Sequence, residues 1–177
     1  SERGELQQIS WPELRRQVAS LAAALRGMGV QRGDRVCAFL PNTPHTIVAM
    51  LAVASVGAIW SVCSPDMGPL AVLDRFRQIE PKVLIGVDGY VYGGVEHDRM
   101  PVLSELLAEL PSVQHMVLLR YRDEAADAAM LAAAGRTLHD FAALTAGDTP
   151  FAPEWLPFDH PLWVVYSSGT TGLPKPI

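Results

Sequence analysis

Short apolar runs alternate with helical stretches along most of the chain, and this alternation restricts the possible folds more than any other feature. Continuous runs such as Arg35–Leu40 and Val83–Val87 are typical of strands that are covered on both faces. Between the runs, apolar residues recur every three or four positions, as they do on one face of a helix. The alternation predicts an α/β fold, with a layered, mostly parallel sheet, right-handed crossovers and helices on both faces.

The first helix carries recognisable signals at both ends. Ser10-Trp11-Pro12-Glu13 is a capping box, in which Ser10 is the cap and Glu13 reaches back toward it. The apolar residues that follow form a single helical stripe. Gly29 can end the helix in the left-handed conformation. We therefore expect a helix that starts after Ser10 and ends at Gly29.

The remaining elements continue the alternation as far as the last strand. Further helices are expected from Pro44 toward Gly57, after a cap at Asp66, from Pro101 to Pro111 and, as a peripheral helix or a mobile insertion, over Asp123–Ala134. Further strands are expected at Ile59–Val62, Val83–Val87, His115–Leu119 and Leu162–Tyr166. The proline-rich segment Phe151–Pro161 should be extended and lead into the last strand.

Length and composition favour a folded globular protein. The chain has 177 residues, of which 49% are hydrophobic and 19% charged, so it can bury one core. Its 14 basic residues are scattered along the chain, and its net charge is −5. Both features argue against a nucleic-acid partner. The longest apolar stretch, Ile47–Ile59, is shorter than the roughly 20 residues that span a bilayer, so no membrane partner is expected.

Cysteine and histidine positions give no sign of a metal site. Cys37 and Cys63 lie in or beside strand-like runs, and we expect them to be buried thiols of a cytoplasmic protein. The five histidines are at least 15 residues apart and lack the spacing of metal ligands. They are His45, His97, His115, His139 and His160. We therefore interpret them as core or surface residues.

The run from Tyr166 to Lys175 has the chemistry of a polyphosphate-binding loop. It places four hydroxyls, two glycines and one lysine directly after a strand-like run. Glycines permit close backbone approach, and consecutive N–H groups, hydroxyls and an ammonium group can all donate to phosphate oxygens. The spacing differs from that of the common P-loop, because Gly169 and Gly172 are three residues apart and Lys175 follows Gly172 by three. No serine or threonine follows the lysine to hold magnesium. An ordinary P-loop hydrolase is therefore excluded.

The same run resembles the phosphate-loop signature of the adenylate-forming superfamily, which includes acyl-CoA synthetases, peptide-synthetase adenylation domains and luciferases. The usual glycine after the lysine is Pro176 here, and Pro-Lys-Pro-Ile resembles the acetoacetyl-CoA synthetase branch. Two further segments, Ala54–Gly68 and Asp74–Leu84, are similar to that branch. The likeness covers most of the chain and is weakest from about residue 119 to residue 161.

The resemblance implies a ligation in two steps. A carboxylic acid, here acetoacetate, attacks the α-phosphate of ATP to give an acyl-adenylate and pyrophosphate, and the thiol of CoA then displaces AMP. Mg²⁺ is expected to help neutralise the phosphates. The residues expected to hold the ATP phosphates are those of the loop, namely Ser167, Ser168, Gly169, Thr170, Thr171, Gly172 and Lys175. The last strand should place them at a carboxyl edge, where ligands of such sheets bind.

A second candidate site follows the strand Val83–Val87. In related acetyl-CoA synthetases the loop after this strand carries arginines that meet the nucleotide end of CoA, and this chain offers Tyr92 and Val95 instead. We expect Tyr92, Gly93 and Gly94 to contact CoA by stacking and backbone groups. The alternative is a glycine-rich surface turn.

The resemblance also bears on domain organisation. Residues 1–177 are expected to form an incomplete N-terminal AMP-binding domain, ending with the phosphate loop and lacking the C-terminal domain. No catalytic residue is assigned within the chain, and the chain alone should be inactive. Alternatives are an acetyl- or propionyl-CoA synthetase, or a non-catalytic nucleotide-binding module. The sequence leaves the oligomeric state open.

Overall fold

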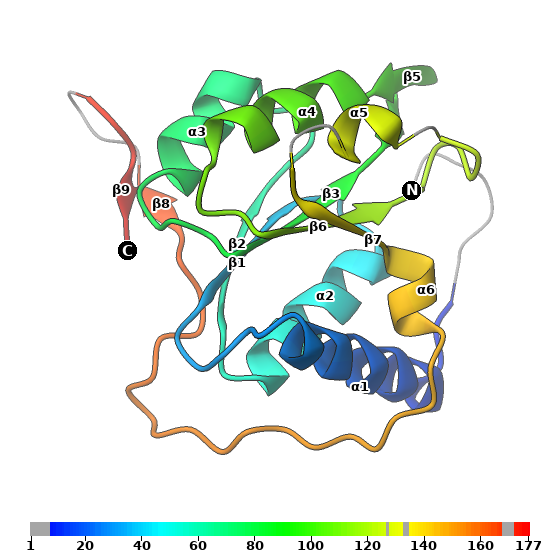
Figure 1. Ribbon diagram of the computed structural model, residues 1–177, viewed down its shortest axis with the longest axis vertical. Helices are drawn as coiled ribbons and strands as arrows, with labels where there is room; N and C mark the ends of the chain where they lie inside the picture. The colour runs from blue at the N-terminus through cyan, green and yellow to red at the C-terminus, as the bar shows by residue number, and fades with distance from the viewer. Residues whose placement is uncertain (1–7, 127, 133–134, 168–171) are drawn as a thin grey trace.

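A five-stranded parallel sheet forms the centre of the computed structural model, which describes residues 8–126, 128–132, 135–167 and 172–177 (Figure 1). Every neighbouring pair of strands is parallel. The strand order is β2-β1-β3-β6-β7, with bounds β1 (Arg35–Phe39), β2 (Ile59–Cys63), β3 (Val83–Val87), β6 (His115–Leu119) and β7 (Thr137–Asp140). The predicted parallel sheet is thus confirmed.

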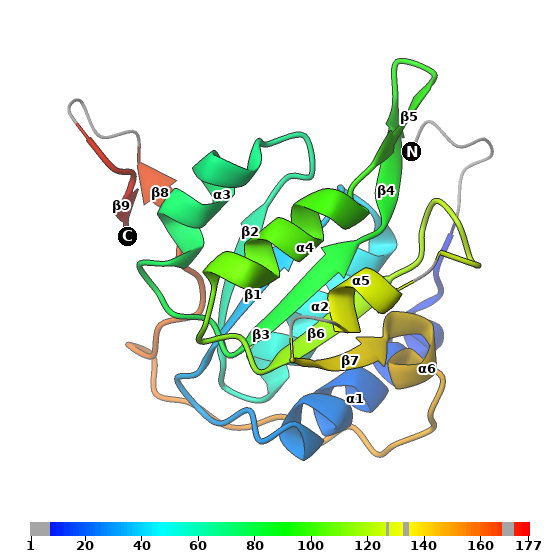
Figure 2. The same ribbon diagram turned by 45° about the horizontal axis from the view of Figure 1, so that its top comes forward.

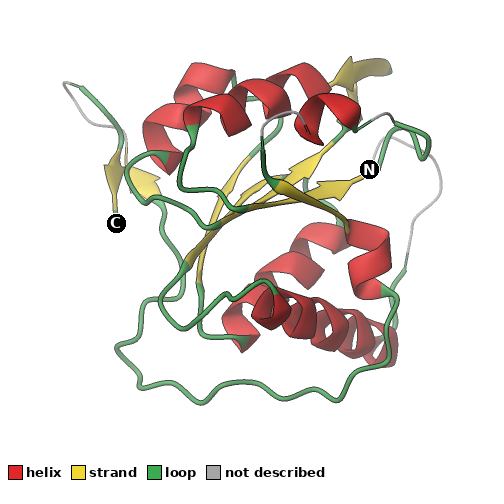
Figure 3. Ribbon diagram, viewed as in Figure 1, coloured by secondary structure: helices red, strands yellow, loops and turns green. Residues whose placement is uncertain are grey.

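Helices cover both faces of the sheet (Figure 3). One layer consists of α1 (Trp11–Gly27), α2 (Pro44–Ser55) and α6 (Phe141–Thr145). The opposite layer consists of α3 (Pro69–Phe76), α4 (Met100–Glu109) and α5 (Ala129–Ala132). This arrangement confirms the α/β fold class that the alternation of apolar runs predicts.

Each layer shares a separate apolar core with the sheet. Successive strand residues point to opposite faces, so Val36 and Ala38 pack toward α1 and α2, while Cys37 and Phe39 pack toward α3 and α4. All four are fully buried. The continuous apolar run in β1 is therefore explained by burial on both faces. Both cysteines are free and buried, as expected.

The ends of the early helices follow the sequence signals with two exceptions. Ser10 Oγ accepts a hydrogen bond from the Glu13 N–H at 3.3 Å, and Gly29 has φ +76°. The Glu13 side chain does not complete the predicted capping box, because its carboxylate accepts charge-assisted hydrogen bonds from Arg16. The predicted cap at Asp66 is also wrong. Helix α3 begins at Pro69 with Gly68 as its cap, since proline is well suited to the first helical position.

The structure differs most from the sequence expectations between β6 and the proline-rich segment. Over Asp123–Ala134, where a peripheral helix or a mobile insertion is expected, the described residues contain the four-residue helix α5. Strand β7 and helix α6 were not predicted, because each is too short to show a clear hydrophobic period. Asp140 ends the strand and starts the helix, since its side chain accepts a hydrogen bond from the Ala143 N–H at 2.9 Å.

A hairpin follows β3 and extends beyond the sheet (Figure 2). It consists of the antiparallel strands β4 (Gly89–Tyr92) and β5 (Val95–Asp98). Gly93 and Gly94 form its turn with φ +58° and φ +75°, a conformation that strongly favours glycine. The glycine-rich segment is therefore a hairpin rather than an irregular loop. Within the described residues, no helix is long and apolar enough to cross a membrane.

Asp88 joins this hairpin to the end of β6. Its side chain is fully buried and accepts hydrogen bonds from the N–H groups of Tyr121, Arg122 and Asp123 at 2.7, 2.9 and 2.8 Å. Its backbone carbonyl accepts a further bond from the Arg99 N–H at 2.8 Å. One carboxylate thus satisfies three successive backbone donors at the carboxyl edge of the sheet.

Replacing Asp88 with alanine should lower the free energy of unfolding by about 3 kcal/mol, because the three backbone donors lose their acceptor. Asp88→Asn keeps one acceptor oxygen and should cost about 1 kcal/mol. Urea unfolding followed by circular dichroism measures both changes. Asp159→Ala, at an exposed position, is the control and should change stability by less than about 0.5 kcal/mol. Equal losses for Asp88→Ala and the control would contradict the bridging role.

Candidate active site

The segment of residues 162–165 extends the parallel sheet beside β2. The Trp60 N–H donates to the Leu162 carbonyl at 3.0 Å, and the Val164 N–H donates to the Trp60 carbonyl at 2.8 Å. The bridge between Trp60 and Trp163 is parallel. The carboxyl end of this segment therefore lies at the same edge as the carboxyl ends of β1, β2 and β3. Of the strand expected at Leu162–Tyr166, the structure shows a parallel bridge at Trp163 and the short strand β8 that begins at Tyr166. The run from Tyr166 to Lys175 therefore follows a segment that pairs with β2, at the sheet edge where ligands of parallel sheets usually bind.

The two arms of the predicted phosphate loop form a short antiparallel hairpin. Strand β8 (Tyr166–Ser167) pairs with β9 (Lys175–Pro176), so that Ser167 lies opposite Lys175. Both side chains are exposed, and among the described residues Lys175 makes no ion pair. The hydroxyl and the ammonium group are thus available to an anion at the end of the hairpin that leads into the connecting loop. Four further predicted residues lie outside the described part of the chain: Ser168, Gly169, Thr170 and Thr171.

Contacts from Tyr166 attach the base of this hairpin to helix α3. The Tyr166 hydroxyl donates to the Arg75 carbonyl at 2.8 Å, and the Arg75 guanidinium lies 5.8 Å from the centre of the tyrosine ring. Burial is the main cause that raises the pKa of the Tyr166 phenol, so the hydroxyl keeps its proton and remains a donor. Sequence reasoning missed this contact, because nothing in the spacing links residues 75 and 166.

A cavity of about 340 Å³ opens at the carboxyl ends of the first three strands. The chain order reverses at this point, since β1 lies between β2 and β3 in the sheet. The lining residues are Pro41, Asn42, Ser64, Pro65, Asp66, Tyr90 and Tyr92. Of the three residues expected to contact CoA, Tyr92 lines the cavity, whereas Gly93 and Gly94 form the turn of the hairpin.

Arg99 holds one wall of this cavity in place. Its guanidinium donates to the Pro65 carbonyl at 2.6 Å and to the Tyr90 hydroxyl at 2.9 Å, and it lies 5.0 Å from the centre of the Tyr90 ring. The same ring stacks on His97 at 4.9 Å between centroids. The Arg99 guanidinium and the His97 imidazole thus fix the orientation of the Tyr90 ring. Sequence reasoning did not assign Arg99, because its contacts join the start of α4 to strand β4 and to the turn after β2.

Sequence comparisons with known proteins identify the family to which this chain belongs. The model of the AMP-binding enzyme family matches residues 2–177. The chain belongs to the AMP-binding enzyme family. It is 47% identical over 179 residues to acetoacetyl-CoA synthetase from Rattus norvegicus, a match that covers 98% of this chain and 26% of the relative. It is 50% identical over 169 residues to acetoacetyl-coenzyme A synthetase from Rhizobium meliloti (strain 1021), covering 94% and 25%.

A solved structure supports the same assignment. Acetoacetyl-CoA synthetase from Streptomyces lividans matches with a TM-score of 0.89 and 52% sequence identity, over 98% of this chain and 26% of that structure. The chain therefore spans about a quarter of the length of the relatives that it matches. The resemblance to the adenylate-forming superfamily is confirmed. The match to the AMP-binding enzyme family covers residues 2–177 and so includes the predicted phosphate loop.

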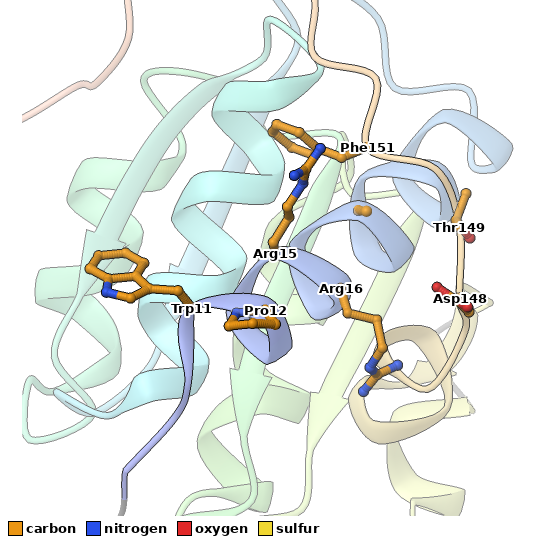
Figure 4. A pocket seen from close by; sticks show the side chains of 8 residues that line it. Trp11, Pro12, Arg15, Arg16, Asp148, Thr149 and Phe151 are labelled. Carbon is orange, nitrogen blue, oxygen red and sulfur yellow. The ribbon is translucent and has the colours of Figure 1, made fainter.

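A larger cavity, of about 460 Å³, lies beside α1 on the opposite helical layer (Figure 4). Figure 4 shows the Arg15 guanidinium next to the ring of Phe151, with 5.6 Å between guanidinium carbon and ring centre. Arg16 donates to Glu13 and to the carbonyls of Thr145 and Gly147. The hydrogen bonds from Arg16 lower the pKa of Glu13 to about 2. Among the described residues, none of those predicted to bind ATP or CoA lines this cavity, so it lies apart from the predicted phosphate and CoA sites.

Two histidines that are distant in sequence meet on neighbouring strands. His115 Nδ1 and His139 Nε2 are 3.2 Å apart, a contact that sequence spacing could not show. Burial, and secondarily the neighbouring His115, lower the pKa of His139, so the neutral form is favoured. Across the described ranges, no group of three or more His, Cys, Asp or Glu residues could hold a metal ion. The pair is therefore interpreted as a hydrogen-bonded cross-strand contact.

Gly172 lies in the predicted phosphate loop, between β8 and β9, and a substitution there tests the predicted site. Its φ is +119°, yet a Cβ atom at this position would meet nothing within 4 Å. Gly172→Ala should therefore strain the backbone without a steric clash, at about 1 to 3 kcal/mol. We expect binding of MgATP by the protein at its natural length to weaken by at least about fivefold, as measured by titration calorimetry.

Gly27→Ala is the matched control for this substitution. Gly27 also has open space around its Cβ position, but it lies in α1 and has no positive φ. Alanine is favoured in helices, so MgATP binding should be unchanged in the control. Equal affinities for the Gly172 and Gly27 variants would show that the conformation of Gly172 does not contribute to the site.

Proposed function

We propose that the protein containing this chain is an AMP-forming ligase that joins acetoacetate to CoA. The observation that carries the proposal is the predicted phosphate loop at the carboxyl edge of a sheet, in a chain that is 47–52% identical to several acetoacetyl-CoA synthetases. Membership of the AMP-binding enzyme family supports the reaction class. The identity of the acid is inferred from the names of the relatives. It is not read from this chain, which spans only a quarter of their length.

In the first step, a carboxylate oxygen attacks the α-phosphorus of ATP as the bond to the pyrophosphate oxygen breaks. The Ser167 hydroxyl and the Lys175 ammonium group are placed on facing arms of the hairpin to donate to the β- and γ-phosphates. Ser168, Gly169, Thr170, Thr171 and Gly172 complete the proposed phosphate-binding set. These residues hold the leaving pyrophosphate and offset its charge, while a carboxylate nucleophile needs no general base.

Mg²⁺ belongs to the proposal as the partner of the nucleotide. No protein cluster of metal ligands exists in the described part of the chain, so the ion would be held chiefly by phosphate oxygens. This mode suits Mg²⁺, which commonly binds through substrate phosphates and few protein groups. When bound, the ion would neutralise charge that develops on pyrophosphate.

In the second step, the thiol of CoA attacks the acyl carbon of the adenylate and AMP leaves. We propose that CoA reaches the site by way of the 340 Å³ cavity that Tyr92 lines. Tyr92 is 70% exposed and can stack on an adenine ring, and the backbone of Gly93 and Gly94 can approach closely. The rigid wall formed by Tyr90 and Arg99 supports this placement.

Residues 1–177 would form the first part of the N-terminal AMP-binding domain of a cytoplasmic enzyme. Within this chain we assign substrate-holding residues and no catalytic residue. The remaining parts of the adenine and acid sites would come from sequence that corresponds to the other three quarters of the relatives.

Acid-dependent exchange between ATP and pyrophosphate tests the proposal directly. The protein at its natural length should exchange label in the presence of acetoacetate, and much more slowly with equal concentrations of acetate or propionate. The reason is that exchange requires reversible formation of the acyl-adenylate. Preference for acetate or propionate would keep the mechanism and overturn the acid. Absence of exchange with all three acids would overturn the ligase and leave a nucleotide-binding module.

Lys175→Ala should raise the KM for ATP in this assay by about 10- to 100-fold, because a charge-assisted hydrogen bond to phosphate is lost. The KM for the acid should change much less. Lys175→Arg keeps the positive charge and should recover part of the affinity for ATP. If Lys175→Ala exchanges with unchanged KM for ATP and unchanged rate, Lys175 does not belong to the phosphate site.

A further inference from the structure

Both arms of the phosphate hairpin are attached to the same place, the carboxyl end of helix α3. On one arm, the Tyr166 hydroxyl donates to the Arg75 carbonyl at 2.8 Å. On the other arm, Gln78 Nε2 donates to the Pro174 carbonyl at 2.8 Å. Arg75 and Gln78 are separated by less than one helical turn in sequence. A single short stretch of chain therefore holds the hairpin from both sides.

Each anchored residue is the direct neighbour of a residue proposed to bind phosphate. Tyr166 precedes Ser167, and Pro174 precedes Lys175. A peptide unit is rigid, so fixing one residue restricts the position of the next. The anchors thus act on the two facing groups that the hairpin offers to the nucleotide.

The hairpin needs such support because it has little stabilisation of its own. It contains only two residue pairs, and a two-stranded hairpin is at best marginally stable in water. Its surroundings contribute a further backbone pair between Val165 and Ile177, while Ser167, Lys175 and Pro176 are exposed. Side-chain hydrogen bonds to α3 therefore make up a large part of what holds its orientation.

A second hydrogen bond fixes the orientation of the Gln78 side-chain amide. The same Nε2 also donates to the Asp74 carbonyl at 2.5 Å, one turn back along the helix. The NH₂ group has two hydrogens, so it can serve both carbonyls at once. The Arg75 guanidinium, which donates to the Ala71 carbonyl, lies against the Tyr166 ring and fixes its plane.

We infer that Gln78 and Tyr166 are positioning residues for ATP, which set the distance between Ser167 and Lys175 through the carboxyl end of α3. The inference rests on the proposed function for the identity of the nucleotide. It goes beyond that function by assigning a role to Gln78, just after α3, and to Tyr166 of β8, which are not among the residues proposed to bind phosphate. A mainly structural role would instead affect stability without selecting one substrate.

The test uses Gln78→Glu and Tyr166→Phe in the protein at its natural length. Glutamate has nearly the same shape as glutamine but, when ionised, cannot donate to the Pro174 carbonyl. Phenylalanine keeps the ring beside Arg75 and removes only the hydroxyl. We expect each variant to raise the KM for ATP in pyrophosphate exchange by about 3- to 10-fold, as for the loss of one hydrogen bond. The KM for acetoacetate and the melting temperature should stay close to their original values.

Gln31→Glu is the matched control. Gln31 is exposed, precedes β1 at the amino edge of the sheet and receives the same change in charge. The KM for ATP of the Gln31→Glu variant should equal that of the unmodified protein. Because Gln78 is also exposed, loss of the fold is not expected to obscure the comparison. Equal KM values for ATP in the Gln78, Tyr166 and control variants would overturn the inference while leaving the ligase intact. A parallel rise in both KM values with a lower melting temperature would also overturn it, in favour of a structural role.

Calorimetric binding of MgATP separates this inference from the proposed function. If the unmodified protein shows no acid-dependent exchange but binds MgATP, weaker binding by Gln78→Glu and Tyr166→Phe supports the positioning role although the ligase fails. If the unmodified protein binds no MgATP, both the positioning role and the phosphate site are refuted.

Discussion

The candidate site depends on the parallel pairing between β2 and the segment of residues 162–165. Backbone hydrogen bonds from Trp60 to both sides of Trp163 fix the direction and the register of this segment. Ser61 adds a third contact, since its buried side chain donates to the Val164 carbonyl at 3.0 Å. An antiparallel arrangement would place Tyr166 at the amino edge of the sheet. Parallel pairing instead places the phosphate hairpin at the edge where β1, β2 and β3 also end.

The connection between β2 and β3 relates the two proposed parts of the site to each other. It begins with Ser64, Pro65 and Asp66, which line the cavity beside Tyr92. Farther along, Arg75 in the last turn of α3 and Gln78 just after the helix hold the phosphate hairpin. Phe76 is fully buried between these contacts and ties the helix to the sheet. One crossover therefore supports the proposed CoA cavity at its start and the proposed phosphate hairpin at its end.

The sequence was sufficient for features that depend on local chemistry. The long apolar runs, the Ser10 cap and the positive φ of Gly29 follow from residues close together in the chain. The phosphate loop could be identified because its hydroxyls, glycines and lysine are contiguous. Strand β7 and the contact of Arg99 with Tyr90 could not be predicted. They depend on which segments become neighbours after folding, and neither has a period or a motif of its own.

The segment between α6 and residue 162 shows how long-range contacts replace regular structure. It must carry the chain from β7, at one edge of the sheet, to the opposite edge beside β2, and it passes across the layer of α1 and α2 (Figure 1). So long a connection without helices or strands would lose considerable conformational entropy on folding. Its backbone is held at intervals by groups of that layer. Arg16 donates to the Gly147 carbonyl, and Arg26 donates to the Ala152 carbonyl.

The last part of this segment is attached to the end of α2 and the turn that follows. The Glu154 N–H donates to the Ser55 carbonyl at 2.9 Å, and His160 Nε2 lies 2.9 Å from the Gly57 carbonyl, which makes the imidazole the donor. Gly57 directly precedes the stretch that leads into β2. The contact at His160 therefore aligns the incoming segment with β2 just before the pairing at Trp60 begins. The position of the phosphate hairpin thus depends on hydrogen bonds at the opposite end of the strand that it follows.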